Sequence, residues 1–364
     1  MFINNPFAGA FGLDLGDASI KLVRLEKKWR PHRGTYFEAR DIRQILLPTG
    51  CIASGELLQP ELVKEKIKIL LGHHKESTAI DSACVVADLP AAKTFLKLIR
   101  ISATEKEISD ESVKLEAAKH LPLDIREMNI DWQIIRGGDA PPGTTQILVG
   151  AAPKKITADY NNLLVSCGLQ PLALEIEDLA IARSLITANK TYEGEARAIL
   201  DLGACRSSII IYDKGSIQFS AKINFSGDVI DTTLVQRLKI ERPVATDLKI
   251  KFGIGYADAY PEYLKIMTEI AEKLADDISQ TMIFYRDHFH NPNPITHITM
   301  SGGLSAMENL DKFLSGKLKL ETAPGDAWKN LFNKNLSSDV KTGLALSSAI
   351  GLALRATVWP SNTK

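Results

Sequence analysis

Several motifs that mark common protein classes are missing from this sequence. Its four cysteines lie far apart and no two form a CxxC pair, which argues against a zinc knuckle and favours reduced, buried thiols. Lysine and arginine together number 44, as do aspartate and glutamate, so the formal net charge is +0. Without a basic surplus or an acidic tail, the charge gives no indication of a nucleic-acid partner. The 364 residues are enough for two domains or one bilobed body.

A long hydrophobic run is absent as well. The N-terminus, MFINNPFAGAFG, has neither a basic region nor an apolar core, so it does not resemble a secretory signal. The most apolar segment, TGLALSSAIGLALRATVW from Thr342 onward, contains two serines and two glycines. It is shorter than the roughly 20 apolar residues that a membrane span needs. A buried helix of small residues is the better interpretation, and we expect a cytoplasmic protein.

Near the start, GLDLGDASIKLV (residues 12–23) places a short polar turn between two apolar runs. The second run, over 20–25, alternates as a strand does, whereas a Rossmann or P-loop turn would lead into a helix. The stretch therefore predicts a β-hairpin. A third strand is expected over 36–47 and a helix over 61–71, which gives the order β-β-β-α by residue 72.

The next segment differs in character and contains its own strands and helices. A charged helix is expected to end before Pro122, a later helix to be closed by Gly168, and a third to be capped by Asp178. The expected elements are strands at 82–90, 94–102, 129–137, 146–153 and 171–177, and helices at 103–122, 156–168 and 178–186.

The polar stretch TANKTYEGEAR (187–197) indicates a boundary between two lobes. After it the order β-β-β-α returns, and its first strand again carries Leu-Asp-Leu-Gly, at 200–203. The two copies are too far apart for a solenoid repeat and fit two lobes that face a central cleft. The later elements are expected to be helices at 227–238, 242–254 and 261–289, a strand at 294–303, and a helix at 304–318.

Two Asp-x-Gly turns have the chemistry of a phosphate site. A phosphate chain needs backbone N–H donors that approach closely, which glycine turns provide, and Mg²⁺ prefers carboxylates that reach it largely through water. The residues concerned are Asp14, Gly16 and Ser19 in the first turn and Asp201, Gly203 and Ser207 in the second. Both aspartates end a strand, so we expect them to face Mg²⁺ while the two turns hold one triphosphate. The alternative is that each is only a hairpin turn.

Two later features could complete such a site. Ser301-Gly302-Gly303 lies at a strand-to-helix junction, at the chain position where a turn that binds the base would be. Lys249, in VATDLKIKFG, lies on a charged helix and is either a nucleotide contact or a solvated lysine.

Together, the two Asp-x-Gly hairpins, a linking helix after an acidic residue and a late Gly-Gly turn resemble the five-motif pattern of the actin, Hsp70 and sugar-kinase ATPases. Within that group the chain resembles the PilM family of type IV pilus assembly, with the cell-division protein FtsA as a relative. The C-terminus, TVWPSNTK, lacks the amphipathic membrane helix of FtsA, which favours PilM. The segments that carry the resemblance are GLDLGDASIKLVRLE, LPTGCIASGELLQPELVKEKIKILL, SACVVADLPAAKTFLKLIRIS, VGAAPKKITADYNNLLVSCGLQPLALEIEDLAIARSLI and ILDLGACRSSIIIYDKGSIQFSAKINFSGDVIDTTL.

The resemblance implies an α/β fold: the actin-like (ribonuclease H-like) bilobed ATPase fold with a small inserted subdomain of SHS2 type. The implied domains are a lobe I core at 1–81 and 159–190, joined by a C-terminal helix at about 342–358; the inserted subdomain at 82–158; a lobe II core at 191–240 and 295–341; and a helical subdomain of lobe II at 241–294.

ATP and Mg²⁺ are the implied cofactors. Glu177 lies where these ATPases place a catalytic or metal-ordering side chain; as a general base it would need to reach water, and the alternative is an exposed carboxylate before a helix. Asp14 and Asp201 are the implied metal contacts. The implied cofactor-binding residues are Asp14, Gly16, Asp17, Ala18, Ser19, Lys21, Asp201, Gly203, Ala204, Ser207, Gly227, Asp228, Lys249, Ser301, Gly302 and Gly303.

Three residues depart from the family pattern. Asp228 stands where a second glycine is expected after Gly227, and an acidic side chain there would face phosphate unfavourably unless it turns away or meets Mg²⁺. Asp17 replaces a small hydroxyl residue in the first turn, and Arg206 lies inside the second, where it could contact phosphate.

The implied function is a cytoplasmic ATP-binding scaffold with at most slow ATP hydrolysis. It would bind the N-terminal cytoplasmic peptide of the inner-membrane protein PilN, couple it to the pilus motor ATPases, and reach the membrane only through such partners; a homo-oligomer is compatible with this function. Two alternatives stay open. One is an FtsA-like filament-forming cytoskeletal protein, and the other is a small-molecule kinase, although no second-substrate motif is present.

Overall fold

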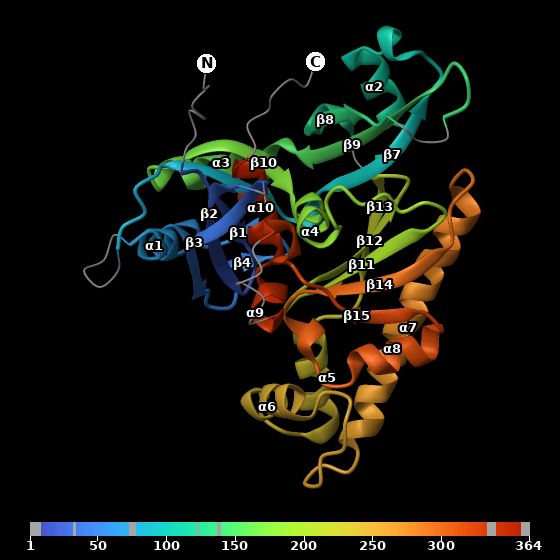
Figure 1. Cartoon of the computed structure of the whole chain (residues 1–364). Coiled ribbons are helices and arrows are strands. Elements are labelled where there is room, and N and C mark those ends of the chain that lie inside the picture. The colour runs from blue at the N-terminus through green and yellow to red at the C-terminus, as the bar shows by residue number, and fades with distance from the viewer. Residues whose placement is uncertain are drawn as a thin grey trace. The chain divides into compact units, whose positions relative to one another are not determined.

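A computed structural model describes residues 9–31, 34–72, 78–121, 124–136, 140–332 and 340–357 (Figure 1). Pro122 and most of the C-terminal TVWPSNTK, both used in the sequence analysis, lie outside these residues. The chain divides into two compact units. The first holds Met1–Ile135, Ala140–Asn189 and the chain from Asp326 onward, and the second holds Arg136–Asp139 and Lys190–Gly325. Residues from 326 onward, which we expected in lobe II up to 341, therefore group with the first unit.

The core of the first unit is a five-stranded sheet with the order β10-β6-β1-β2-β3. β1 and β2 pair antiparallel, with Leu15 opposite Ile20, which confirms the predicted hairpin. β6 pairs parallel with both β1 and β10, so it lies inside this sheet and not in the inserted segment where the predicted boundary at 82 placed it. The strands are β1 (Phe11–Leu15), β2 (Ser19–Arg30), β3 (Gly34–Leu46), β6 (Cys84–Leu89) and β10 (Gln170–Ile176); a small hairpin adds β4 (Ile52–Ala53) and β5 (Glu56–Leu57).

Helices pack on both faces of this sheet. On one face, Phe11 and Leu13 of β1 are buried against Ile67 of α1 and Tyr160 of α3. On the other face the small C-terminal helix α10 lies along β1 and α4 (Figure 1). The helices of the core are α1 (Pro60–Leu70), α3 (Lys154–Ser166), α4 (Glu177–Leu185), α9 (Val340–Ala345) and α10 (Ser347–Thr357).

Close backbone approach explains the small residues of the C-terminal segment. A Cβ on Gly351 of α10 would lie 1.8 Å from the Ala180 carbonyl oxygen, and one on Gly12 would lie 2.5 Å from the Ala349 carbonyl oxygen. Only glycine lets the helices and the strand come this near. The predicted buried helix is thus confirmed in α10, although a turn at Leu346 separates it from α9. No helix among the described residues is both long and apolar enough to span a bilayer.

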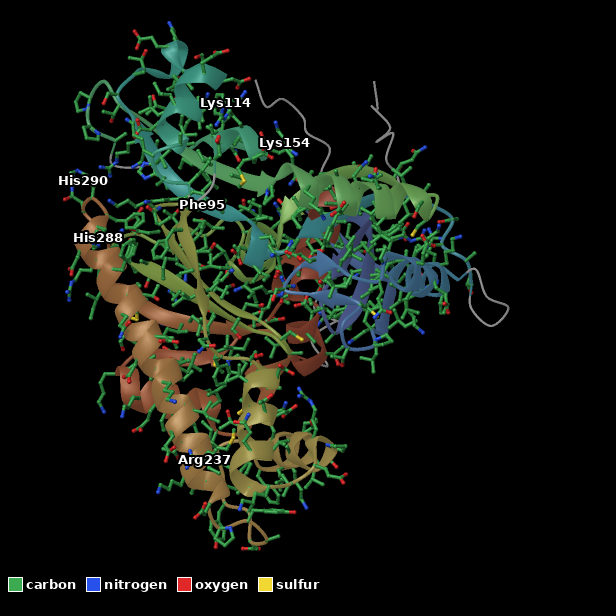
Figure 2. All side chains as sticks on the ribbon, turned by 180° about the vertical axis from the view of Figure 1, so that it is seen from behind. Phe95, Lys114, Lys154, Arg237, His288 and His290 are labelled. Carbon is green, nitrogen blue, oxygen red and sulfur yellow. The ribbon has the colours of Figure 1, made fainter. Side chains whose placement is uncertain are left out.

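The inserted subdomain of the first unit contains three neighbouring strands in the order β7-β9-β8, and helix α2 packs against them. In Figure 2, Phe95 labels the start of β7 and Lys114 labels a position within α2. Ile99, Val113 and Val149 form its small core. The elements are β7 (Phe95–Ile101), α2 (Asp110–Ala117), β8 (Met128–Ile134) and β9 (Thr145–Pro153).

The helix predicted over 103–122 is wrong in length. Its N-terminal part is a 3₁₀ turn, Glu105–Glu107, which the Thr104 side chain caps together with Glu107. A second cap at Ser109 then starts α2, since its hydroxyl accepts a hydrogen bond from the Ser112 amide. Two capping residues within one charged stretch divide it into two short helices.

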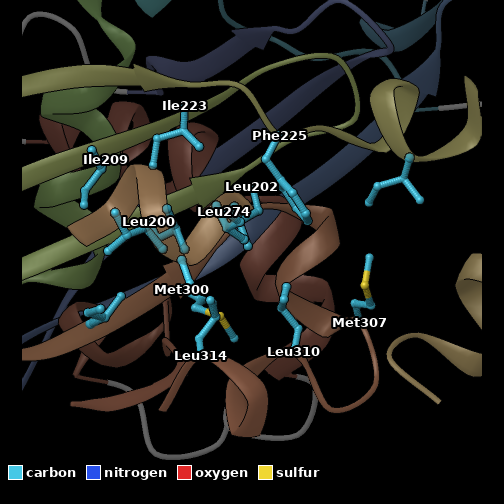
Figure 3. Close-up of a cluster of buried hydrophobic side chains, with 14 of the residues drawn as sticks. Leu200, Leu202, Ile209, Ile223, Phe225, Leu274, Met300, Met307, Leu310 and Leu314 are labelled. Carbon is cyan, nitrogen blue, oxygen red and sulfur yellow. The ribbon is translucent and has the colours of Figure 1, made fainter. Parts of the chain in front are cut away.

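The second unit is built on five strands in the order β15-β14-β11-β12-β13. Leu200, Leu202 and Met300 of the sheet pack against Leu274 of α7 and Leu314 of α8 in its core (Figure 3). The predicted helix over 304–318 starts late, at Leu310, because Asn309 adopts a left-handed conformation. The elements are β11 (Ala196–Leu202), β12 (Ser207–Asp213), β13 (Ser216–Ile223), α5 (Gly227–Leu238), α6 (Arg242–Phe252), α7 (Tyr263–His288), β14 (Ile295–Ser301), α8 (Leu310–Leu318) and β15 (Glu321–Pro324).

Replacing Gly351 tests the close packing of α10. The Gly351→Ala variant should lose about 3 kcal/mol of unfolding free energy, because its methyl group must push α10 away from α4. The matched control is Gly316→Ala, on α8 with no atom within 4 Å of the new Cβ, which should gain about 0.5–1 kcal/mol. Urea unfolding of both variants measures the difference. Equal midpoints would contradict the packing described here.

Candidate functional site

The first predicted phosphate turn lies between β1 and β2. Asp14 faces Lys21 across the hairpin, and the Lys21 ammonium donates to Asp14 Oδ2 at 2.8 Å. A Cβ on Gly16 would lie 3.1 Å from the Ser19 carbonyl oxygen, so the turn is tight. Asp14 and Ser19 are both buried. The fold thus brings the first-turn residues together as the sequence predicted, and it adds a direct Asp14–Lys21 ion pair.

Asp17, the acidic residue that departs from the family pattern, points to the protein backbone. Its Oδ1 accepts a hydrogen bond of 3.3 Å from the amide of Gly55, in the turn between β4 and β5. The side chain is buried. A charge held by a backbone donor stabilises the neighbouring hairpin, so Asp17 contributes to the shape of the turn.

Three carboxylates converge where the parallel strands of the first unit end. Asp14 is the second-last residue of β1, Asp88 is the second-last residue of β6, and Glu177 directly follows β10. Because the three strands run parallel, their carboxyl ends meet at one edge of the sheet. One ligand oxygen from each of the three side chains lies within 4.8 Å of the others.

Each of these carboxylates has a defined support. The Asp88 Oδ1 atom accepts from the Leu15 amide at 2.9 Å, and Glu177 Oε2 accepts from the Ala91 amide at 3.3 Å. Glu177 is also the first residue of α4, where the helix dipole favours negative charge. Asp14 and Asp88 are almost fully buried, with 2% of each exposed. Oxygen ligands this close together are what Mg²⁺ and Ca²⁺ take, and a cation would relieve their mutual repulsion.

Sequence reasoning missed Asp88. The signal was present, since Asp88 ends an apolar strand, CVVADLP, just as Asp14 ends FGLDL. The predicted cap of α4 was also wrong. Ile176 occupies the N-cap position without a side-chain hydrogen bond, and the helix begins one residue earlier than expected. That shift is what places Glu177 in the first turn, beside the two aspartates.

In the second unit, the turn between β11 and β12 is closed by a hydrogen bond of 2.9 Å from the Gly203 amide to the Arg206 carbonyl. Asp201 lies opposite Ser208 in the antiparallel pair and opposite Ser301 in the parallel one. A Cβ on Gly302 would lie 2.3 Å from the Leu202 carbonyl oxygen, so this position requires glycine. The second and third predicted turns therefore lie side by side.

The N-terminus of α5 donates its first amides to the second turn. The Gly227 amide bonds to the Gly203 carbonyl at 3.2 Å, and the Asp228 amide bonds to the Ala204 carbonyl at 2.8 Å. The next amide, of Val229, donates to the Ser226 hydroxyl. In this structure these backbone donors, two of which we expected to face phosphate, bond within the protein. The side chain of Asp228 forms an ion pair with Arg242 of α6.

Lys249 is buried, which excludes the solvated alternative. Its Nζ lies 2.6 Å from Asp231 Oδ1 and donates to the Gly227 carbonyl oxygen at 3.2 Å. Thr246 donates to the other Asp231 oxygen at 2.9 Å. The lysine thus fixes α6 against the start of α5, directly behind the second turn.

Residues 12–357 match a family described as type IV pilus assembly protein PilM. The solved structure of a PilM–PilN type IV pilus biogenesis complex has a TM-score of 0.80 and 20% identity, covering 97% of this chain and 100% of that one. The ethanolamine utilization protein EutJ from Carboxydothermus hydrogenoformans has a TM-score of 0.56 and 13% identity, covering 95% of this chain and 89% of its own.

A curated relative is the cell division protein FtsA of Streptococcus pneumoniae. It is 21% identical over 267 residues, which span 67% of this chain and 56% of FtsA. MreB5 of Spiroplasma citri, solved with AMPPNP, has a TM-score of 0.50 and 13% identity, covering 94% of each chain. These proteins share the actin-like fold, which confirms the predicted fold class.

The carboxylate cluster predicts a loss of cation affinity when Asp88 is neutralised. Asp88→Asn keeps an oxygen that can accept from the Leu15 amide but removes a charge, so affinity for Mn²⁺ should fall by about tenfold or more. Asp159→Asn, at a partly exposed position on α3, is the control. Calorimetric titration with Mn²⁺ measures both. An affinity unchanged in Asp88→Asn would argue against a metal centre here.

Proposed function

The chain belongs to the family described as type IV pilus assembly protein PilM, and we propose that it is a nucleotide-regulated scaffold of that assembly. The observation that carries this proposal is the match over residues 12–357, which includes both Asp-x-Gly hairpins and the inserted subdomain. A scaffold of this kind responds to ATP by changing which conformation is populated and needs little turnover.

ATP and Mg²⁺ are the proposed ligands. Relatives in the actin-like fold support this, since MreB5 was solved with AMPPNP. In the first unit, Asp14, Asp88 and Glu177 would hold Mg²⁺, which neutralises phosphate charge when bound. In the second unit, Asp201 and the turn residues near Gly203 and Gly302 would contribute contacts to the nucleotide. Glu177 is proposed either to order the metal or to act as a general base.

The remaining residues of the proposed site are those that the family resemblance implied. In the first unit Lys21 forms an ion pair with Asp14, so its ammonium would leave this carboxylate and bind a phosphate when nucleotide binds. In the second unit Lys249 would act from behind α5, because it is buried against Asp231. The other proposed nucleotide contacts are Gly16, Asp17, Ala18, Ser19, Ala204, Ser207, Gly227, Asp228, Ser301 and Gly303.

Loss of either aspartate should weaken nucleotide binding. Asp14→Ala and Asp201→Ala are each expected to lower the affinity for Mg²⁺-ATP by about tenfold or more, because Asp14 would hold the metal and Asp201 would contact the metal-bound nucleotide. Isothermal titration with Mg²⁺-ATP tests this, with Asp159→Ala as the control. If both variants bound as tightly as the unaltered protein, ATP binding through these two turns would be refuted.

The proposed protein partner is the N-terminal cytoplasmic peptide of PilN, and the PilM–PilN complex among the solved structures supports it. An extended peptide in a groove beside the inserted subdomain is the physical expectation for a short, partly apolar segment. Such a partner would hold the protein at the inner membrane and would relay its state to the pilus motor ATPases.

Replacing the inserted subdomain tests the peptide site. Since β6 and α3 belong to the core, and the Ala91 amide supports Glu177, the replacement should span 94–152 only, with a Gly-Ser linker between Lys93 and Pro153. Binding of a PilN N-terminal peptide should disappear while Mg²⁺-ATP affinity stays within about twofold, because the cluster lies outside the replaced segment. Fluorescence anisotropy of a labelled peptide measures the first and calorimetry the second. Peptide binding that survives the replacement would place the groove elsewhere.

A filament-forming role remains the alternative because of the similarity to FtsA over 267 residues. Filaments seen by electron microscopy with ATP, together with binding to lipid without PilN, would support it over the scaffold.

A further inference from the structure

One hydrogen bond joins the carboxylate cluster to the start of the inserted subdomain. Glu177 Oε2 accepts it from the Ala91 amide at 3.3 Å. Ala91 begins the 3₁₀ turn Ala91–Lys93, which leads directly into β7, the first strand of the subdomain. Asp88, the second member of the cluster, is only three residues before Ala91 in the chain.

The same end of α4 also contacts the last strand of the subdomain. A Cβ on Gly150 of β9 would lie 3.1 Å from Cδ1 of Ile176, the residue before Glu177. β9 runs into α3 at Pro153 and so carries the chain back to the core. The residues that begin α4 therefore contact the first turn and the last strand of the inserted subdomain.

A second acidic residue of the site supports the 3₁₀ turn from another direction. Asp17 accepts a hydrogen bond from the Gly55 amide. Gly55 in turn packs closely against Pro90, since a Cβ on Gly55 would lie 2.4 Å from Cγ of Pro90. Next to Gly55, Glu56 forms an ion pair of 2.5 Å with Lys93. The turn that carries the chain into the subdomain is thus positioned by Glu177 and, through the small hairpin, by Asp17.

We propose that occupancy of the carboxylate cluster controls the inserted subdomain through the Glu177–Ala91 hydrogen bond. This inference rests on the proposed function, because it assumes that the cluster takes a divalent cation with its nucleotide. A cation draws negative charge from the Glu177 carboxylate, so the carboxylate becomes a weaker acceptor for the Ala91 amide. At 3.3 Å that bond is longer than the usual 2.9–3.0 Å, and a weaker acceptor would lengthen it further.

Glu177 is then a positioning residue for the subdomain as well as a member of the cluster. When Glu177 no longer accepts from Ala91, the first turn of the subdomain is released, and the partner peptide is proposed to bind in a groove beside this subdomain. Linkage requires the reverse effect too, so a peptide that fixes this turn must change the affinity for Mg²⁺-ATP by the same factor.

Ala91→Pro is a clean test of this hydrogen bond. Proline removes the amide donor, and it fits because Ala91 is the first residue of its turn and Pro90 is already extended, with ψ 127°. Ala91→Ser is the matched control, since it keeps the donor. The measurement is hydrogen–deuterium exchange of the full chain with and without Mg²⁺-ATP, read over residues 92–101, with binding confirmed separately by calorimetry.

Mg²⁺-ATP is expected to speed exchange over 92–101 by about fivefold or more in the unaltered chain and in Ala91→Ser, and to change nothing in Ala91→Pro. A response that persists in Ala91→Pro, or is absent from the unaltered chain while calorimetry shows bound Mg²⁺-ATP, would overturn the inference and leave the proposed function standing. Absence of Mg²⁺-ATP binding would overturn both. Should Ala91→Pro fail to fold, Glu177→Gln at saturating Mg²⁺-ATP replaces it, and its exchange should likewise not respond.

Discussion

The parallel pairing of β6 with β1 on one side and with β10 on the other is the constraint on which the candidate site depends. It sets the carboxyl ends of three strands at one edge, so that one acidic residue from each strand end comes within 4.8 Å of the others. On one face of that sheet, α10 and α4 pack closely against each other at Gly351. Since β6 continues into the inserted subdomain and β10 continues into α4, the same pairing connects the site to both.

The sequence was informative where local chemistry decides the structure. Alternation after Ser19 predicted the first hairpin, and small residues around Gly351 predicted a buried C-terminal helix; the structure confirms both. Long-range packing could not be predicted from the sequence. Asp88 became a site residue only once β6 was seen between β1 and β10, and the burial of Lys249 depends on Asp231 from another helix. The prediction of one helix over 103–122 was wrong because Thr104 and Ser109 each cap a helix. The single periodic pattern of the sequence did not indicate that two short helices begin there.

The two acidic residues that depart from the family pattern have structural partners. Asp17 accepts from Gly55, and Asp228 pairs with Arg242. Their charges are therefore directed to backbone or arginine, and they do not contradict a phosphate site. Meanwhile α5 gives its first amides to the second turn. Under the proposed function, phosphate contacts in that unit would come from the turn itself or would follow a local rearrangement of α5.

A crystal structure with ATP and Mn²⁺ tests the central claim most directly, because anomalous scattering locates manganese without assumption about its ligands. The account predicts a manganese peak held directly or through water by Asp14, Asp88 and Glu177. Nucleotide bound with no metal peak near these three carboxylates would contradict it.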